Sequence, residues 1–355
     1  MATPKFSTVP NSFHAELKKR INQYFQQNKK SFTGNAVLYT KAIILFVSFA
    51  WLYVHLVFLT PATPWAILEC VLLGLVGAAI GFNIMHDGAH GSFSKHKWVN
   101  NIAAFSLSIL GGSTFMWNMK HNVIHHAYTN IDGVDDDIDI KPWMRMSTTQ
   151  PRHKLHKYQH IYFWFLYSFL YIFWIFLLDY QKYFKQRIGA MPLKKMSVSD
   201  HITFWAFKAM YLFLFIGLPI YRLGFVNWLI GFVIFGIVTG LVISIVFQLA
   251  HTVEHTHFPM PDDATGKLSD EWAVHQLKTT ANFAPDSKWI SWYVGGLNFQ
   301  IEHHLFPKIS HVHYPAISKI VKQACKEYDV PYIEYAKMRY AIASHVHFLK
   351  HMGTA

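Results

Sequence analysis

Long apolar runs are the feature that most limits what this chain can fold into. Hydrophobic residues make up 52% of its 355 residues and charged residues only 15%, and the apolar residues are gathered into runs. A helix needs about 20 apolar residues to cross the hydrocarbon core of a bilayer. Four runs have about this length, at 42–59, 65–85, 203–221 and 225–249. The chain is therefore predicted to be an all-α membrane protein with four transmembrane helices.

Basic residues indicate how these helices are oriented. Lysines and arginines precede the first run, whereas the turn at 60–64 carries no charge, so the N-terminus is predicted to be cytoplasmic. A fifth run at 161–178 has basic residues on both flanks. If it crossed the bilayer, the histidine motifs described below would lie on opposite sides. We therefore predict an interfacial or re-entrant helix there, and a second segment that dips or lies flat at 101–118.

These expectations give one membrane domain, 1–355, with two transmembrane hairpins, interfacial helices and a cytosolic helical cap. The predicted parts are a cytosolic N-terminal segment at 1–41, hairpins at 42–85 and 203–249, a cytosolic or interfacial region at 86–202, and a cytosolic region at 250–355. Both termini are predicted to be cytoplasmic. The formal charge of +12 is explained by the flanks of the spans and by lipid headgroups, not by nucleic acid. Cys70 and Cys325 give no reason to expect a disulfide.

Three histidine motifs lie beside these runs: HDGAH at 86–90, HNVIHH at 121–126 and QIEHH at 300–304. A structural zinc ion takes about four ligands, so seven imidazoles indicate two metal ions. Imidazole suits Zn, Cu, Fe and Ni, which leaves the metal open. The candidate ligands are His86, His90, His121, His125, His126, His303 and His304, with Gln300 less certain.

Helical spacing supports shared ligation. On an α-helix His86 and His90 share a face, His121 and His125 repeat that spacing, and His126 points about 100° away, toward a second metal. In the third motif, Gln300, His303 and His304 lie on one face.

His251, two residues beyond the fourth run, is a further candidate ligand. Gly77 and Gly81 in the second run and Gly236 and Gly240 in the fourth have the small-xxx-small spacing that permits close helix packing. Contact between these runs would place His86 and His251 side by side. His255 and His257 are weaker candidates.

Other polar residues are assigned lesser roles. Six histidines are interpreted as interface or surface residues: His96, His153, His156, His160, His311 and His313. Seven residues are close enough in sequence to accept the second N–H of a ligating imidazole: Asp87, Asn122, Asp132, Asp135, Asp136, Asp137 and Glu302. Most of the acidic run at 135–139 is interpreted as a solvated loop.

The three motifs, with GGLNFQIEHHLFP around the last, resemble the histidine boxes of the integral-membrane fatty acid desaturases. The resemblance extends from the first run to about Pro315. It implies a non-haem di-iron centre that uses O2 to place a cis double bond in an acyl chain. By position the seven motif histidines would ligate iron, with His251 as an additional ligand. Gln300, in place of a histidine, resembles the front-end subgroup, which desaturates between an existing double bond and the carboxyl end.

The resemblance also has consequences for partners. Nothing matches the haem-binding HPGG motif of a fused cytochrome b5 domain, so electrons are expected from a separate ferredoxin or cytochrome b5 type donor with its reductase. The expected substrate is an acyl-CoA or acyl-lipid, and the expected location is a bacterial inner membrane. Aromatics at 117–143 and 289–293 are interpreted either as walls of an acyl tunnel or as interfacial anchors.

Three alternative functions stay open: a related di-iron hydroxylase or ketolase, a sphingolipid desaturase, and a metal transporter. Transport is disfavoured because transport sites usually lie near the bilayer midplane at broken helices. The histidine motifs instead lie at or beyond helix ends.

Overall fold

The computed structural model describes residues 4–7 and 12–355, and the described part is almost entirely helical. It contains five helical stretches long and apolar enough to cross a membrane: Ala36–Leu59, Thr63–His90, Lys154–Lys185, Val198–Leu223 and Phe225–His251. Four of them contain the runs predicted as spans, and the third contains the run predicted as interfacial. The prediction of an all-α membrane protein is confirmed.

Most of the five stretches join several helical elements end to end. The first is α2 (Ala36–Val54) and η1 (His55–Leu59), and the second is α3 (Thr63–Ile80), η2 (Gly81–Met85) and α4 (His86–His90). The third is η4 (Lys154–Tyr158), α8 (Gln159–Phe173), η5 (Trp174–Leu178) and α9 (Asp179–Lys185). The last two are α10 (Val198–Leu212), η6 (Phe213–Gly217) and α11 (Leu218–Leu223), followed by α12 (Phe225–His251).

Shorter elements connect these stretches and cover one end of them. The connecting elements are α5 (Lys97–Ile109), α6 (Thr114–Trp117), η3 (Asn118–His125), α7 (His126–Tyr128), β1 (Arg187–Ile188) and β2 (Met191–Pro192). We call the covering elements the cap: α1 (Phe13–Gln27), α13 (Trp272–Thr279), β3 (Asn282–Phe283), α14 (Lys288–Tyr293), α15 (Gln300–Leu305), η7 (His311–His313), α16 (Tyr314–Glu327), β4 (Glu334–Tyr335) and α17 (Met338–Thr354).

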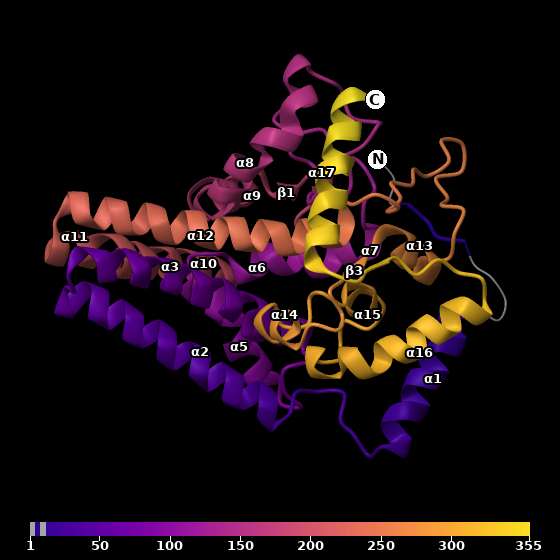
Figure 1. The fold of residues 1–355 in the computed structure, drawn as a ribbon, viewed down its shortest axis with the longest axis horizontal. Coiled ribbons are helices and arrows are strands. Elements are labelled where there is room, and N and C mark those ends of the chain that lie inside the picture. Colours follow the sequence, from indigo (N-terminus) through magenta and orange to yellow (C-terminus); the bar gives the residue numbers. More distant parts are fainter. Residues whose placement is uncertain (1–3, 8–11) are drawn as a thin grey trace.

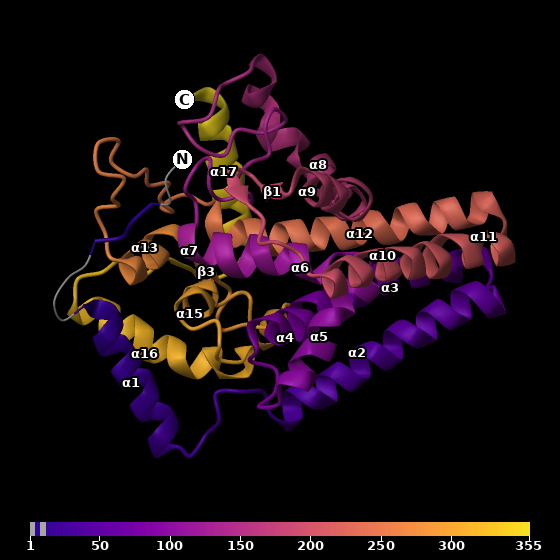
Figure 2. The same cartoon turned by 180° about the vertical axis from the view of Figure 1, so that it is seen from behind.

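The long helices extend to one side of the molecule, and the cap lies at their other end (Figures 1 and 2). Helix α1 belongs to the cap, because Leu17 shares a buried apolar cluster with Leu277 of α13, Ile301 of α15 and Val321 of α16. The helices that carry histidines at their ends are α3, continued by α4, and α12, and both point these ends at the cap (Figures 1 and 2).

Helices α3 and α12 pack closely, as the glycine pattern predicted, and the predicted Gly77 lies at this contact, since a Cβ on it would lie 3.5 Å from the Phe235 ring. A Cβ on Gly74 of α3 would lie 3.0 Å from the Phe235 carbonyl oxygen of α12, whereas a Cβ on Gly81 would meet no described atom within 4 Å. Gly240 of α12 instead faces α8, where a Cβ would lie 2.5 Å from the Ser168 carbonyl oxygen. The expectation that Gly236 and Gly240 pack against the second span is wrong, because α8 occupies that face of α12.

The stretch that contains α8 contacts the histidine-bearing end of the molecule at both of its own ends. Near its start, Gln159 donates a hydrogen bond to the Leu349 carbonyl oxygen of α17. Near its end, Lys182 forms a 3.0 Å ion pair with Asp136, which also pairs with Lys120 next to His121. This geometry is the one expected of a helix that enters and leaves on the same side. Whether it crosses the bilayer stays a prediction, as do the domain boundaries.

Candidate metal centre

Eight histidines from four parts of the chain meet where the long helices reach the cap. His86 and His90 lie on α4, which continues α3. The second motif follows a turn and lies on η3 and α7, and His251 is the last residue of α12. His303 and His304 lie on α15 in the cap. Residues separated by more than two hundred positions are thereby brought into one site.

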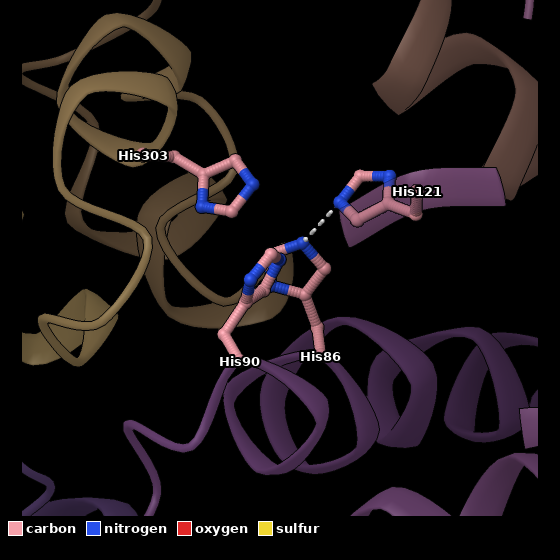
Figure 3. A group of neighbouring side chains, drawn as sticks. All are labelled: His86, His90, His121 and His303. Carbon is pink, nitrogen blue, oxygen red and sulfur yellow. Dashed lines mark hydrogen bonds between the residues drawn. The ribbon is translucent and has the colours of Figure 1, made fainter. Parts of the chain in front are cut away.

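The ligand atoms form two neighbouring groups. His86, His90, His121 and His303 make the first group, with their ligand nitrogens all within 4.8 Å of one another (Figure 3). His125, His251 and His304 make the second group under the same criterion. His126 lies between the two, because it meets the criterion with His303 and His304 and its Nε2 is 3.2 Å from that of His121. Two adjacent groups match the two metal ions predicted from the number of imidazoles.

A π-helix changes the expected spacing in the second motif. Asn118–His125 forms π-helical hydrogen bonds from each residue to the fifth one along. His121 and His126, five residues apart, therefore approach each other, whereas the α-helical prediction sent His126 away from His121. His125 falls in the group of His251 and His304, whereas the neighbouring His126 is grouped with His303 and His304.

Four of the rings have one nitrogen bonded to the protein and the other turned inward. The four Nδ1 atoms lie near protein oxygens: His125 to Asp135 at 3.0 Å, His251 to the Thr279 carbonyl at 3.2 Å, His303 to the Tyr314 hydroxyl at 3.2 Å, and His304 to Gln276 Oε1 at 2.8 Å. Their Nε2 atoms are buried and have no hydrogen-bond partner among the described residues. In a metal-ligating histidine one ring nitrogen binds the metal, and the other ring N–H donates a hydrogen bond to an oxygen. The residues therefore fit metal ions.

The protonation state of the rings also fits metal binding. Burial, together with the neighbouring imidazoles, holds the pKa of His121, His126, His303 and His304 well below the ordinary value. Imidazole must be neutral to ligate a metal. For His125 burial acts in the same direction, but the carboxylates of Asp135 and Asp137 oppose it and raise the pKa.

Gln300 lies on the same short helix as His303 and His304 and is 1% exposed. Both Oε1 and Nε2 of its amide are buried and lack a hydrogen-bond partner in the described part of the chain. A buried amide without partners costs free energy, so this side chain is poised for a ligand or a bound water.

Gln276 is a residue that the sequence reasoning missed. Its Oε1 accepts from His304 Nδ1 and, at 3.0 Å, from the Thr129 hydroxyl, and its Nε2 donates to the His126 carbonyl oxygen at 3.1 Å. One amide thus joins the second and third motifs. Nothing in the local sequence of α13 indicates this role, because it depends on how α13 packs against α15.

Asp135, Asp136 and Asp137 are among the residues predicted to accept a hydrogen bond from a metal-ligating histidine. They contact the candidate ligand His125 or Lys120, which precedes His121. Asp135 is 1% exposed and bonds His125, and Asp137 lies 3.2 Å from the same Nδ1. Lys120 pairs with Asp136 and Asp137. The interpretation of this run as mostly solvated is wrong, because Asp135, Asp136 and Asp137 contact His125, Lys120 and Lys182 next to the site.

The remaining residues predicted to bond a ligating histidine have other hydrogen-bond partners. Glu302 accepts from Asn282 and Tyr332, and burial raises its pKa to about 8. Asp87 accepts from the Ser310 hydroxyl and lies 3.1 Å from His311 Nδ1. Asn122 donates to the Ala89 carbonyl oxygen and to Asn118 Oδ1. Asp132 accepts from the Thr149 hydroxyl and from Gln150 Nε2.

Several expectations about single histidines need correction. His156, His311 and His313 are buried, at 1%, 4% and 8% exposure, and are not surface residues. His251 joins His125 and His304 and does not lie beside His86, because the first group is completed by the second and third motifs. The weaker candidates His255 and His257 are exposed and lie outside the ligand groups.

The aromatics proposed as tunnel walls divide into two kinds. Trp117 stacks on His121, with ring centroids 4.4 Å apart, and also contacts the rings of His86 and His90. Trp143 and Trp289 are 66% and 85% exposed and do not line the centre.

Comparison with known proteins places the chain in a family. The model of the fatty acid desaturase family matches residues 62–336. The chain is 39% identical to the sn-1 linoleoyl-lipid 6-desaturase of Arthrospira platensis, covering 96% of this chain and 92% of that protein. It is 37% identical to the acyl-lipid (8-3)-desaturase of Physcomitrium patens, covering 99% of this chain and 74% of that protein. The chain therefore belongs to the fatty acid desaturase family and is a membrane oxidoreductase that desaturates fatty acyl chains.

Proposed function

We propose that the chain is a front-end acyl-lipid desaturase with a di-iron centre, which places a cis double bond between an existing double bond and the carboxyl end. The observation that carries the metal assignment is the pair of histidine groups, in which the Nε2 atoms of His90, His125, His251, His303 and His304 are buried without a hydrogen-bond partner among the described residues. The substrate class is supported by relatives named as linoleoyl-lipid 6-desaturases, from Arthrospira platensis and Synechocystis sp.. Gln300 supports the front-end assignment.

Each side chain has a defined task in this proposal. The first group, with His86, His90, His121 and His303, would hold one iron, and His125, His251 and His304 would hold the other, with His126 between them. Imidazole is a suitable ligand for iron. The bound irons supply the oxygen activation and hydrogen abstraction. The protein orients the rings through their Nδ1 partners and keeps bulk water from a site in which most ligands are buried.

The proposal extends to location and partners. With the cap and both termini on the cytoplasmic side, a separate redox protein of ferredoxin or cytochrome b5 type would reach the centre from the cytosol. Basic residues before the first span support this orientation. A bacterial inner membrane is the proposed location.

The test is expression in a host that lacks polyunsaturated lipids, with defined mono- and diunsaturated acids supplied. We expect a new double bond on the carboxyl side of the existing one, located by mass spectrometry. His304→Ala, matched for membrane level, is the inactive control. A hydroxylated product would assign the chain to hydroxylation instead, and a new bond on the methyl side would refute the front-end assignment.

A further inference from the structure

The approach to the metal centre is marked by its least buried ligand. His90 is only partly buried, whereas the other seven histidines of the two groups are buried. Its neighbour Ala89 is also partly exposed. An acyl chain must reach the centre from outside, and the end of α4 is the place where the described histidines of the two groups are least covered.

Two indoles lie near this end of α4. Trp117 belongs to a buried cluster with Met85 and Leu107, and Trp174 of η5 packs against the cluster together with Ala89. Trp174 is itself half-buried, and its neighbours Phe173 and Leu177 are 49% and 43% exposed on the apolar surface of the helix. Trp174 therefore stands between the lipid-facing surface and the ring that stacks on His121.

A buried ion pair fixes both indoles. Asp179 accepts from Trp174 Nε1 at 3.0 Å and from the Ser113 backbone N–H at 2.7 Å, and Ser113 caps the helix that carries Trp117. Lys208 of α10 donates to the same carboxylate at 2.9 Å.

Backbone carbonyl oxygens accept the other two hydrogen bonds from the Lys208 ammonium group. Lys208 also donates to the Gly111 and Ile175 carbonyl oxygens, at 2.7 and 3.0 Å. Asp179 and Lys208 are 0% and 5% exposed. Buried charges are costly unless they are paired and hydrogen-bonded, and here all three ammonium hydrogens have acceptors. The pair holds the turn before α6 and the start of η5 in one arrangement.

We infer that Trp174, held in place by the Asp179–Lys208 pair, is a specificity-determining residue that sets which acyl chains reach the metal centre. This inference rests on the proposed desaturase function. The indole narrows the apolar path beside His90, so removal of the indole widens it.

The test compares three variants in the expression host, supplied with an equal mixture of shorter and longer diunsaturated acids. Trp174→Ala should shift the ratio of long-chain to short-chain product by about tenfold, the scale on which a hydrophobic pocket discriminates a methylene group. Trp174→Phe, which mainly removes the bond to Asp179, should shift the ratio in the same direction by less. Asp179→Asn combined with Lys208→Met removes both charges together and should match Trp174→Phe.

Trp228→Phe is the matched control. Trp228 is also half-buried and donates its indole N–H to a carbonyl oxygen, that of Phe215, but it lies toward the other end of α12. Its product ratio should equal that of the wild type. Unchanged ratios in the Trp174 variants that reach wild-type membrane levels would overturn the inference, and Trp174→Phe decides alone if the alanine variant does not accumulate. Wild-type protein that forms no double bond would instead refute the proposed function.

Discussion

At the residue scale, the centre depends on side chains that orient imidazoles as much as on the imidazoles themselves. Side-chain oxygens of Asp135, Gln276 and Tyr314 lie within hydrogen-bond distance of the Nδ1 atoms of three of these rings. The rings are those of His125, His304 and His303, respectively. Outer partners of this kind fix the tautomer that presents Nε2 to a metal.

Gln276→Leu keeps the volume of the side chain but removes the acceptor of His304 Nδ1 and the donor to the His126 carbonyl oxygen. Loss of such a partner typically lowers metal affinity by about 10–100-fold. We expect faster loss of iron to a chelator, measured on the purified protein, with partial recovery in Gln276→Glu.

The control for this experiment is Gln323→Leu, at an exposed position where the amide bonds only Glu327. It should retain iron like the wild type. Wild-type retention in Gln276→Leu would show that the contact is incidental.

Gln300 allows a second prediction at this scale. Its buried amide lies on the same short helix as His303 and His304 and has no hydrogen-bond partner among the described residues, so Gln300→Ala should cut turnover severely. Gln300→His restores an imidazole and should keep part of the activity. Double-bond position should be unchanged in both variants, because the shape of the path presents the carbon. Full turnover in Gln300→Ala would remove Gln300 from the centre.

The sequence identifies the candidate ligands but not most of the residues that hydrogen-bond to them. The motif histidines and His251 are recognisable because imidazoles at short spacings beside apolar runs are typical of metal ligands. Gln276 and Tyr314 are not recognisable, since each acts on a ring from another element. The register of η3 is not predictable either, because tertiary contacts select a π-helical turn over an α-helical one.

At the element scale, the packing of α8 on α12 is the contact that most distinguishes this fold from two simple hairpins. Gly240→Ala would place a methyl group 2.5 Å from the Ser168 carbonyl oxygen. Overpacking of this kind costs about 1–3 kcal/mol. We expect a lower melting temperature in detergent, while Gly81→Ala, which meets no described atom within 4 Å, should melt like the wild type.

The topology prediction concerns the stretch Lys154–Lys185, which contains α8. Lys157→Cys and Lys185→Cys, both at exposed positions near its ends, should be labelled by an impermeant maleimide only from the cytoplasm. Ala62→Cys, in the turn between the first two spans, should be labelled only from the other side. The native cysteines are buried and give little background. Opposite labelling of the two lysine positions would establish a fifth span.

The sequence predicted the long helices closely, because run length is set by bilayer thickness. It predicted the contact between α3 and α12 but not the contact between α8 and α12. The glycines of α12 have the spacing of a packing motif, but the partner is α8 and not α3, and only the assembled bundle decides between them.

At the scale of the whole molecule, the metal centre joins the membrane helices to the cap. Its candidate ligands come from α4, η3, α7, α12 and α15, so a metal bound there would couple parts of the chain that are far apart in sequence. A ligand that binds only the folded state stabilises it, by about 2.7 kcal/mol when the free ligand is roughly a hundredfold above its Kd.

Removal of iron with a chelator should therefore lower the melting temperature, and addition of ferrous iron should restore it. The measurement is a thermal melt of the purified protein with and without metal. His304→Ala should respond less than the wild type, and an unchanged melting temperature after complete iron removal would contradict the coupling.

The most direct test of the two-group centre is the iron content of purified protein. We predict about two iron ions per chain in the wild type, held by imidazole ligands, and loss of about one ion in each of His90→Ala and His251→Ala, which belong to different groups. A wild-type content of about one ion, or of another metal in place of iron, would contradict the account.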